Sequence, residues 1–116
     1  MGKIRRKARY VPERGDIVWV NFSPQSGHEQ RGFRPGVVLS PVSYNRRTAL
    51  AILCPITSRR KGYSFEVEVA TGDITGVALA DQIKSLDVSS RKISYLGTLD
   101  RETLEEIAEI AKELIG

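Results

Sequence analysis

The sequence predicts a small, mainly β domain, either a barrel or a sandwich, that ends in one α-helix. Short runs rich in β-branched and aromatic residues are separated by Gly and polar turns, which is typical of small all-β domains. In Ser64–Ala70 apolar and acidic residues alternate, as in an antiparallel strand with one buried face. After Leu99 the apolar residues recur at helical spacing instead. A chain of 116 residues has room for one such domain with a modest core.

The predicted strands follow one another with short connections. Asp16–Phe22 is rich in Val, Ile and aromatic residues, and Gly36–Ser40 is a second short strand. Thr48–Ile56 is apolar enough to be buried on both faces, and Tyr44–Arg47 before it is interpreted as a turn. The remaining predicted strands are Ser64–Ala70, Gly76–Ala80 and Ile93–Leu96.

The C-terminal segment predicts an amphipathic helix that packs on the β domain. Asp100 is the expected N-cap, and Leu99 and Leu104 are expected to form a hydrophobic staple across it. The apolar face consists of Leu104, Ile107, Ala108, Ala111, Leu114 and Ile115.

The composition, 41% hydrophobic and 28% charged, is ordinary for a soluble globular protein. Neither a membrane-spanning run nor the apolar core of a signal peptide is found, so we expect a cytoplasmic protein with no membrane partner. The only cysteine, Cys54, lies in an apolar run. We therefore expect a buried, inert thiol in a reducing compartment.

The net charge of +4 is distributed unevenly along the chain. Residues 1–9 are expected to form a basic, flexible arm, followed by a single domain over residues 10–116. Further basic residues fall at predicted turns, and basic loops on a β scaffold suggest a polyanionic partner. An ordinary solvated surface is the alternative. The arm itself is expected either to contact the phosphates of such a partner or to be a spectator.

The connection from Ser23 to Pro35, between the first two predicted strands, is the candidate functional stretch. A connection of this length in so small a domain is uncommon unless it binds or catalyses something. Its last part, His28–Pro35, is the stretch of most interest. It carries a carboxylate, an amide, two guanidiniums and the chain's only imidazole, at Glu29, Gln30, Arg31, Arg34 and His28. Pro35 pushes Arg34 toward an extended conformation, which aims its guanidinium. This set suits an oxyanion or a phosphate, and a solvated hairpin loop is the alternative.

Several blocks of the sequence occur in a distinctive order. They are Gly15–Phe22, Glu29–Gln30, Arg34–Ser40, Pro55–Ser58, Lys61–Val67 and Gly76–Ser85. Together they resemble the MazF/PemK family of toxin endoribonucleases, and the resemblance runs from about Tyr10 to Gly116. It implies an SH3-like β-barrel with a C-terminal helix, built as a homodimer.

The resemblance also implies metal-independent cleavage of single-stranded RNA at short sequences, which stops translation and growth. The ribose 2′-OH attacks the adjacent phosphate and leaves a 2′,3′-cyclic phosphate and a 5′-hydroxyl. Arg34 matches the family's catalytic arginine, Thr57 its catalytic threonine, and Glu29 a glutamate that takes or relays the proton. From the residues alone, a surface salt bridge for Arg34 or Glu29 and a turn role for Thr57 remain alternatives.

Further polar, basic and aromatic side chains are candidates for contacts with RNA. They are Gln30, Arg31, Tyr44, Arg46, Arg47, Lys61, Gln82 and Lys84. His28 lies outside the matching blocks and is interpreted as an exposed loop residue. Trp19 and Phe22 can stack on bases, but at strand positions they are expected in the core.

The implied partners are single-stranded RNA, a second copy of the chain, and a cognate antitoxin whose acidic, disordered tail folds into the RNA groove. The sequence contains no His, Cys or carboxylate cluster with metal-ligand spacing, so we expect no metal and no cofactor. Two other classes stay open. One is a non-catalytic toxin of the same barrel that acts on a DNA topoisomerase, and the other is a passive RNA-binding module.

Overall fold

The computed structural model describes residues 10–23, 32–89 and 91–116. Their element order is mainly β with a C-terminal helix, as the sequence predicts. The elements are β1 (Asp16–Asn21), β2 (Phe33–Val38), α1 (Val42–Thr48), β3 (Leu50–Thr57), β4 (Glu66–Thr71), β5 (Ile74–Leu79), β6 (Lys84–Asp87), β7 (Ile93–Thr98) and α2 (Arg101–Ile115).

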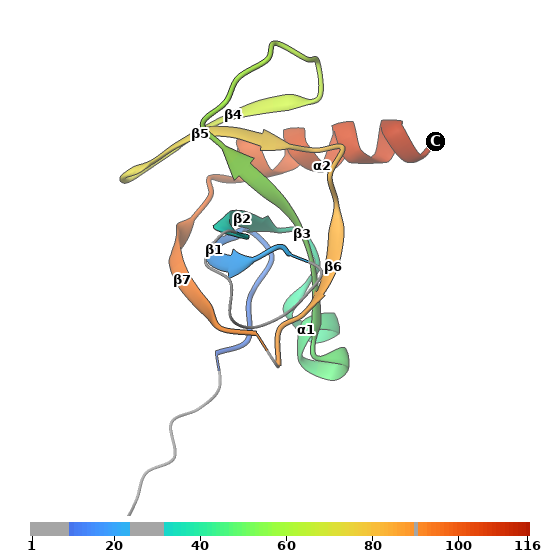
Figure 1. Cartoon of the computed structure of the whole chain (residues 1–116). Helices are drawn as coiled ribbons and strands as arrows, with labels where there is room; N and C mark the ends of the chain where they lie inside the picture. The colour runs from blue at the N-terminus through green and yellow to red at the C-terminus, as the bar shows by residue number, and fades with distance from the viewer. Residues whose placement is uncertain (1–9, 24–31, 90) are drawn as a thin grey trace, which may run out of the picture.

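The strands of this part of the chain form one curled antiparallel sheet in the order β4-β5-β3-β2-β1-β7, with β6 paired to β3. β3 therefore contacts three other strands. Its first half pairs with β6, its middle with β2 and its last two residues with β5. The sheet curls around β1 and β2, while β4, β5 and α2 lie at one end of the barrel and α1 at the other (Figure 1).

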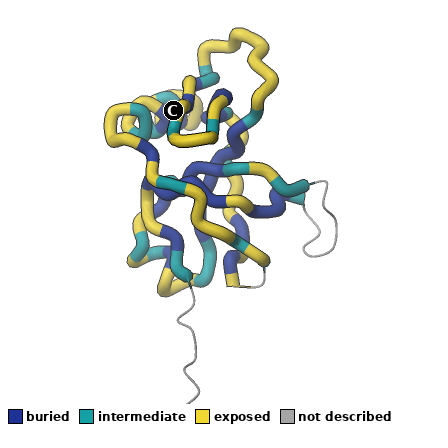
Figure 2. The backbone as a smooth tube through the Cα atoms, turned by 90° about the vertical axis from the view of Figure 1, so that its left-hand side faces the viewer, coloured by how far each residue is buried: buried dark blue, intermediate teal, exposed yellow. Residues whose placement is uncertain are grey.

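Both faces of the sheet are buried, and each has its own core cluster. Val18, Val20 and Leu53 belong to the cluster inside the curl. Ile17 and Val37 belong to the cluster under α2, together with Ile107 of that helix. Figure 2 shows these buried stretches running through the body of the fold, while the connection from β3 to β4 is exposed.

β3 and α2 confirm two predictions in detail. β3 contributes Leu53 to one cluster and Ile56 to the other, so it is buried on both faces. At the start of α2 the Asp100 carboxylate accepts the Thr103 N–H at 3.0 Å, as expected of an N-cap. This hydrogen bond to the backbone, with one from the Thr103 hydroxyl, holds the pKa of Asp100 below its ordinary value.

The predicted turn at Tyr44–Arg47 is wrong, because this segment lies within the α1 helix. The segment contains no Gly or Pro, and it is fixed by a buried amide: Asn45 Nδ2 donates to the Pro12 carbonyl at 2.8 Å. The Ser40 hydroxyl donates to Asn45 Oδ1 at 2.6 Å. The helix ends at Ala49, which has a φ of 62°. Thr48 is consequently helical and does not begin β3.

Two further differences concern strands. β2 begins at Phe33, before the predicted Gly36, because the ladder with β1 extends to the pair Asn21–Phe33. β6 was not predicted, since Leu86 is its only buried residue and no alternation marks it. Its register comes from pairing with β3.

Phe22 is buried as expected, whereas the core position expected for Trp19 is wrong. Trp19 is 42% exposed and stacks on Phe33, with ring centroids 5.9 Å apart.

Cys54 confirms the prediction of a buried thiol. It is fully buried in β3, and this burial raises its pKa to about 12. Because the reactive form is the thiolate, this cysteine is inert near neutral pH. Among the described residues no helix is both long and apolar enough to cross a membrane.

We expect Ile107→Ala to lower the free energy of unfolding by about 2–5 kcal/mol, because the side chain is fully buried between α2 and the sheet. Urea unfolding followed by circular dichroism measures this loss. The control is Glu109→Ala on the exposed side of the same helix, which should change stability by less than about 0.5 kcal/mol. Equal losses for the two variants would show that α2 does not close the core.

Candidate active site

The site begins where β3 leaves β2. The ladder between these strands ends at the pair Gly36–Pro55, and β3 then pairs with β5. The hydrogen bond from Leu39 N to the Ile52 carbonyl shows that the odd-numbered residues of β2 point their N–H groups toward β3. The next such residue, Pro35, has no N–H, so the ladder loses its donor at this point. Continuing the β2–β3 register beyond its last pair would set Arg34 opposite Thr57. The strands separate there instead, and the space between them is open to solvent.

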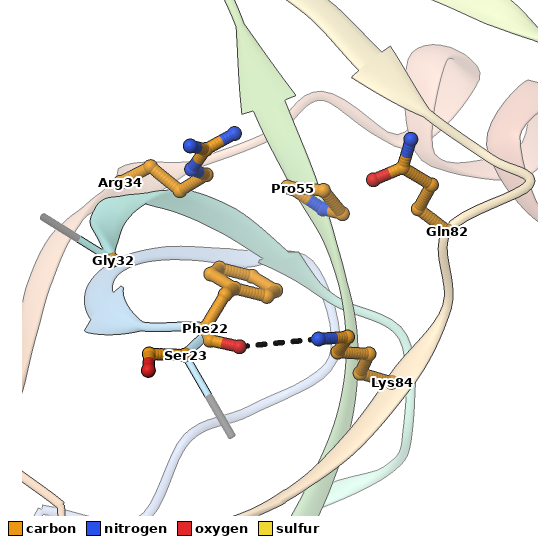
Figure 3. A pocket seen from close by; sticks show the side chains of 7 residues that line it. All are labelled: Phe22, Ser23, Gly32, Arg34, Pro55, Gln82 and Lys84. Atoms are coloured by element: carbon orange, nitrogen blue, oxygen red, sulfur yellow. Dashed lines mark hydrogen bonds between the residues drawn. The ribbon is translucent and has the colours of Figure 1, made fainter. Parts of the chain in front are cut away.

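Two adjoining cavities occupy this opening. The first has a volume of about 240 Å³ and is lined by Phe22, Ser23, Gly32, Arg34, Pro55, Gln82 and Lys84. Figure 3 shows the Arg34 and Gln82 side chains on either side of Pro55, with Lys84 below them. The second, of about 180 Å³, is lined by Arg34, Thr57, Arg59, Lys61, Tyr63, Phe65, Glu66, Leu79 and Gln82. Arg34 and Gln82 line both cavities, which we call together the Arg34 groove.

The groove is positively charged. Its described lining carries the cationic side chains of Arg34, Arg59, Lys61 and Lys84. The one carboxylate in that lining, Glu66, accepts the backbone N–H groups of Lys61 and Gly62 at 3.0–3.2 Å. Within the described ranges, Arg34 is exposed and forms no ion pair with a carboxylate. A guanidinium in this position can bind an anion in the groove through two parallel hydrogen bonds.

Thr57 ends β3 with its hydroxyl in a defined orientation. Its Oγ1 accepts the Arg59 N–H at 3.2 Å. Because this bond uses a lone pair, the hydroxyl proton remains free to donate toward the groove. The backbone of Thr57 is held by pairing with Val77 of β5.

Gly76 lies directly behind Thr57. Its φ is 156°, and a Cβ at this position would come within 2.5 Å of the Thr57 carbonyl oxygen. Only glycine therefore allows β5 to approach Thr57 this closely.

Two cations hold the end of β1, next to the groove. Lys84 Nζ donates to the Phe22 carbonyl at 3.1 Å, as Figure 3 shows. Arg91 Nη1 donates to the carbonyls of Asn21 and Ser23 at 2.8 and 3.1 Å. The Phe22 N–H donates to the Gly32 carbonyl at 2.9 Å, which closes the base of the connection between β1 and β2. The backbone of residues 21–23 is therefore held against Gly32 and these two cations.

The structure brings together some of the predicted site residues and separates others. Arg34, Thr57, Lys61, Gln82 and Lys84 all line the Arg34 groove. Lys84 also holds the β1 end, a role that its sequence position did not indicate. The predicted residues Glu29, Gln30 and Arg31, with His28 and the arm 1–9, lie outside the described residues.

Tyr44, Arg46 and Arg47 do not lie at the groove. They belong to α1, which precedes the first residue of β3, whereas Thr57 is the last. The eight residues of β3 separate the two ends by roughly 23 Å, at about 3.3 Å per residue. α1 lies at the opposite end of the barrel (Figure 1), so any contact of these three residues with RNA would be made away from the groove. That they contact RNA stays a prediction.

Sequence reasoning missed Pro55, Arg59, Tyr63, Phe65 and Arg91. The two aromatic residues are brought together by a turn, which the Glu66 N–H closes by donating to the Tyr63 carbonyl at 3.1 Å. The alternation of the following strand did not indicate this turn. A proline inside an otherwise apolar strand marks a place where a ladder ends. Nothing in the sequence indicated that Arg91 would reach the end of β1.

No three His, Cys, Asp or Glu side chains converge to form a metal site within the described ranges. The groove presents donors and positive charge, which suit a phosphate better than a cation. Metal independence remains a prediction.

The chain shares this architecture and much of its sequence with known proteins. A family model described as a PemK-like, MazF-like toxin of a type II toxin–antitoxin system matches residues 13–115. The endoribonuclease toxin MazF of Escherichia coli (strain K12) is 46% identical over 109 residues, which cover 94% of this chain and 98% of that protein. The endoribonuclease toxin ChpB of the same strain is 39% identical over 100 residues, 81% of this chain and 85% of its own length.

Solved structures agree with these matches. The crystal structure of MazF from Deinococcus radiodurans has a TM-score of 0.84 at 47% identity, over 93% of this chain and 99% of that one. A crystal structure of MazE–MazF from the same organism has a TM-score of 0.81 at 41% identity, over 93% and 98% of the two chains. The predicted fold class, an SH3-like β-barrel with a C-terminal helix, is thereby confirmed. The chain belongs to the family of PemK-like and MazF-like toxins of type II toxin–antitoxin systems.

Proposed function

We propose that this chain is an endoribonuclease toxin that cleaves single-stranded RNA at short sequences, stops translation and growth, and is neutralised by a cognate antitoxin. The observation that carries the proposal is the Arg34 groove, in which Arg34 and Thr57 line one cavity of about 180 Å³. The cationic lining suits a phosphodiester backbone, and the relatives MazF and ChpB bear the name endoribonuclease.

The proposed reaction is an in-line transesterification. The ribose 2′-oxygen forms a bond to the adjacent phosphorus while the bond from phosphorus to the 5′-oxygen breaks. The 2′-OH gives up its proton to a base, and the leaving 5′-oxygen receives one from an acid. The products are a 2′,3′-cyclic phosphate and a 5′-hydroxyl, and no water or metal enters the step.

Arg34 and Thr57 act on the charge that grows on the phosphate oxygens during this step. The planar guanidinium of Arg34 can donate two hydrogen bonds to two phosphate oxygens. The Thr57 hydroxyl, whose lone pair already accepts the Arg59 N–H, donates its proton to a phosphate oxygen.

Glu29 is proposed to take or relay the 2′-OH proton. In the sequence it lies between Ser23 and Gly32. Arg91 holds the Ser23 carbonyl, and Phe22 holds the Gly32 carbonyl. Glu29 is followed by Arg31 and Arg34 in the sequence, and nearby positive charge favours the ionised carboxylate that a general base requires.

Two protein partners follow from the same groove and from the end of α2. The antitoxin is proposed to place an acidic, disordered tail in the Arg34 groove, where it competes with RNA; a structure of a relative is a MazE–MazF complex. A second copy of the chain is proposed to cover apolar surface that one copy leaves exposed. Leu114 and Ile115 at the end of α2 are 54% and 82% exposed.

The first test removes the main charge stabiliser. Arg34→Ala should reduce the cleavage rate by roughly 10²–10³ or more, because it deletes donors aimed at the developing phosphate charge. The measurement is single-turnover cleavage of a long RNA, with folding checked by circular dichroism. Arg101→Ala, which removes an exposed arginine at the start of α2, is the control and should cleave at the wild-type rate. Wild-type turnover by Arg34→Ala would overturn the assignment.

Thr57→Val should be impaired as well, and Thr57→Ser should recover part of the activity because it keeps the hydroxyl.

The second test removes the nucleophile. An RNA with 2′-deoxyribose at the scissile position should bind almost as well as the unmodified RNA but should not be cut, because no other oxygen can take the place of the 2′-OH. EDTA should leave cleavage of the unmodified RNA unchanged. A metal-activated water would cut both substrates and fail in EDTA. A passive RNA binder would cut neither, and a topoisomerase poison would be indifferent to both.

The third test concerns assembly. Sedimentation at micromolar concentration should give the mass of a dimer, and Ile115→Glu should shift the equilibrium toward the monomer by placing a charge in the buried contact. The control is Glu109→Ala, on an exposed position of the same helix. A wild-type monomer at that concentration would contradict the proposed dimer.

A further inference from the structure

Tyr63 and Phe65 form a stacked aromatic pair at the outer side of the Arg34 groove. Their ring centroids lie 5.0 Å apart with an angle of 11° between the planes. Phe65 is half-buried, whereas Tyr63 is 55% exposed. Phe65 thus supports one face of the Tyr63 ring and the exposed ring is left to meet a ligand. An exposed aromatic ring that covers little of the core is unusual unless it contacts a partner.

The segment that carries this pair is held in place by its own hydrogen bonds. The Glu66 carboxylate accepts the N–H groups of Lys61 and Gly62, the latter at 3.0 Å. Arg60 Nε and Nη2 donate to the Glu68 carboxylate at 2.7 and 3.0 Å. These two carboxylates project from β4 and fix the connection from β3. The Tyr63 ring is therefore positioned before any ligand binds, which reduces the entropy lost on binding.

The pair lies in the same cavity as the proposed catalytic residues. Tyr63, Phe65, Arg34 and Thr57 all line the cavity of about 180 Å³. In single-stranded RNA each phosphate is flanked by nucleobases, so a phosphate held at Arg34 brings a base within reach of the walls of this cavity. Proteins bind splayed bases by stacking them on aromatic rings.

We propose that Tyr63 is a stacking platform for one nucleobase next to the scissile phosphate, supported from behind by Phe65. The inference rests on the proposed function, because it requires RNA in the Arg34 groove. Stacking depends on the face of a base and not on its edge, so Tyr63 contributes affinity and positioning for any base at that place. By fixing a neighbouring base it orients the 2′-OH for attack, which makes Tyr63 a positioning residue.

The test measures whether the loss of one base and the loss of the Tyr63 ring have the same effect on RNA binding. The substrate is an RNA with 2′-deoxyribose at the scissile position, so that it is not cut, and with an abasic residue placed in turn at each nucleotide around that bond. For the wild-type protein, removing the stacked base should weaken binding by roughly 5- to 150-fold, the effect of losing one base–aromatic stack. In Tyr63→Ala the same abasic residue should cause no loss, because the stack is already missing. Tyr63→Phe should behave like the wild type, and Tyr63→Leu, which keeps apolar bulk without a π face, like Tyr63→Ala.

The control is Tyr95→Ala on β7. Tyr95 is 54% exposed, nearly as much as Tyr63, but it does not line the groove. The abasic profile, meaning the loss of affinity caused by an abasic residue at each position, should therefore be the same for Tyr95→Ala as for the wild type. Identical abasic profiles for the wild type and Tyr63→Ala would overturn the inference, as would a uniform loss at every position. Failure of the proposed function is a separate outcome, in which the wild-type protein leaves unmodified RNA intact.

Discussion

The arrangement of this protein depends on one strand that pairs with three others. The β2–β3 ladder stops after Gly36–Pro55, because the next residue of β2, Pro35, has no N–H to donate to β3. The last two residues of β3 pair only with β5, along the other edge. Arg34 and Thr57 therefore lie on strands that separate, and both side chains line one cavity. β3 also contributes to both core clusters, which means that the position of the groove is set by the packing of the whole sheet.

The electrostatics of the groove follow from this separation. Arg34, Arg59, Lys61 and Lys84 share one opening whose single described carboxylate is engaged by backbone N–H groups. Like charges that line the same opening repel each other, and this repulsion lowers the stability of the free protein. A phosphodiester backbone or an acidic peptide relieves that repulsion. In the proposed function RNA and antitoxin compete through this electrostatic attraction, and both interactions should weaken as salt is added.

The sequence allowed prediction of elements whose signal is local. The alternation before Ala70, the apolar run of β3 and the helical period after Asp100 each depend on neighbouring residues, and all three are found in the structure. α1 and β6 were not predicted, because each is stabilised by residues far away in the sequence. Asn45 of α1 donates a hydrogen bond to the Pro12 carbonyl, and β6 takes its register from β3. The prediction that Arg34 and Thr57 belong to one site came only from the family resemblance. Residues 21 positions or more apart in the chain, such as Arg34 and Pro55, are brought together by strand register, which composition and periodicity do not encode.

The close approach of Gly76 to the carbonyl of Thr57 makes the position of the Thr57 hydroxyl, which is proposed to act on the phosphate, depend on a residue with no side chain. A methyl group at position 76 would have to displace the Thr57 backbone, while every functional group of the groove remained chemically intact. For a toxin this is a vulnerability. Cells that the toxin harms can inactivate it through a substitution at Gly76 that leaves Arg34 and Thr57 unchanged. The same position offers experimenters a way to obtain a silent protein that still presents its cationic surface to an antitoxin.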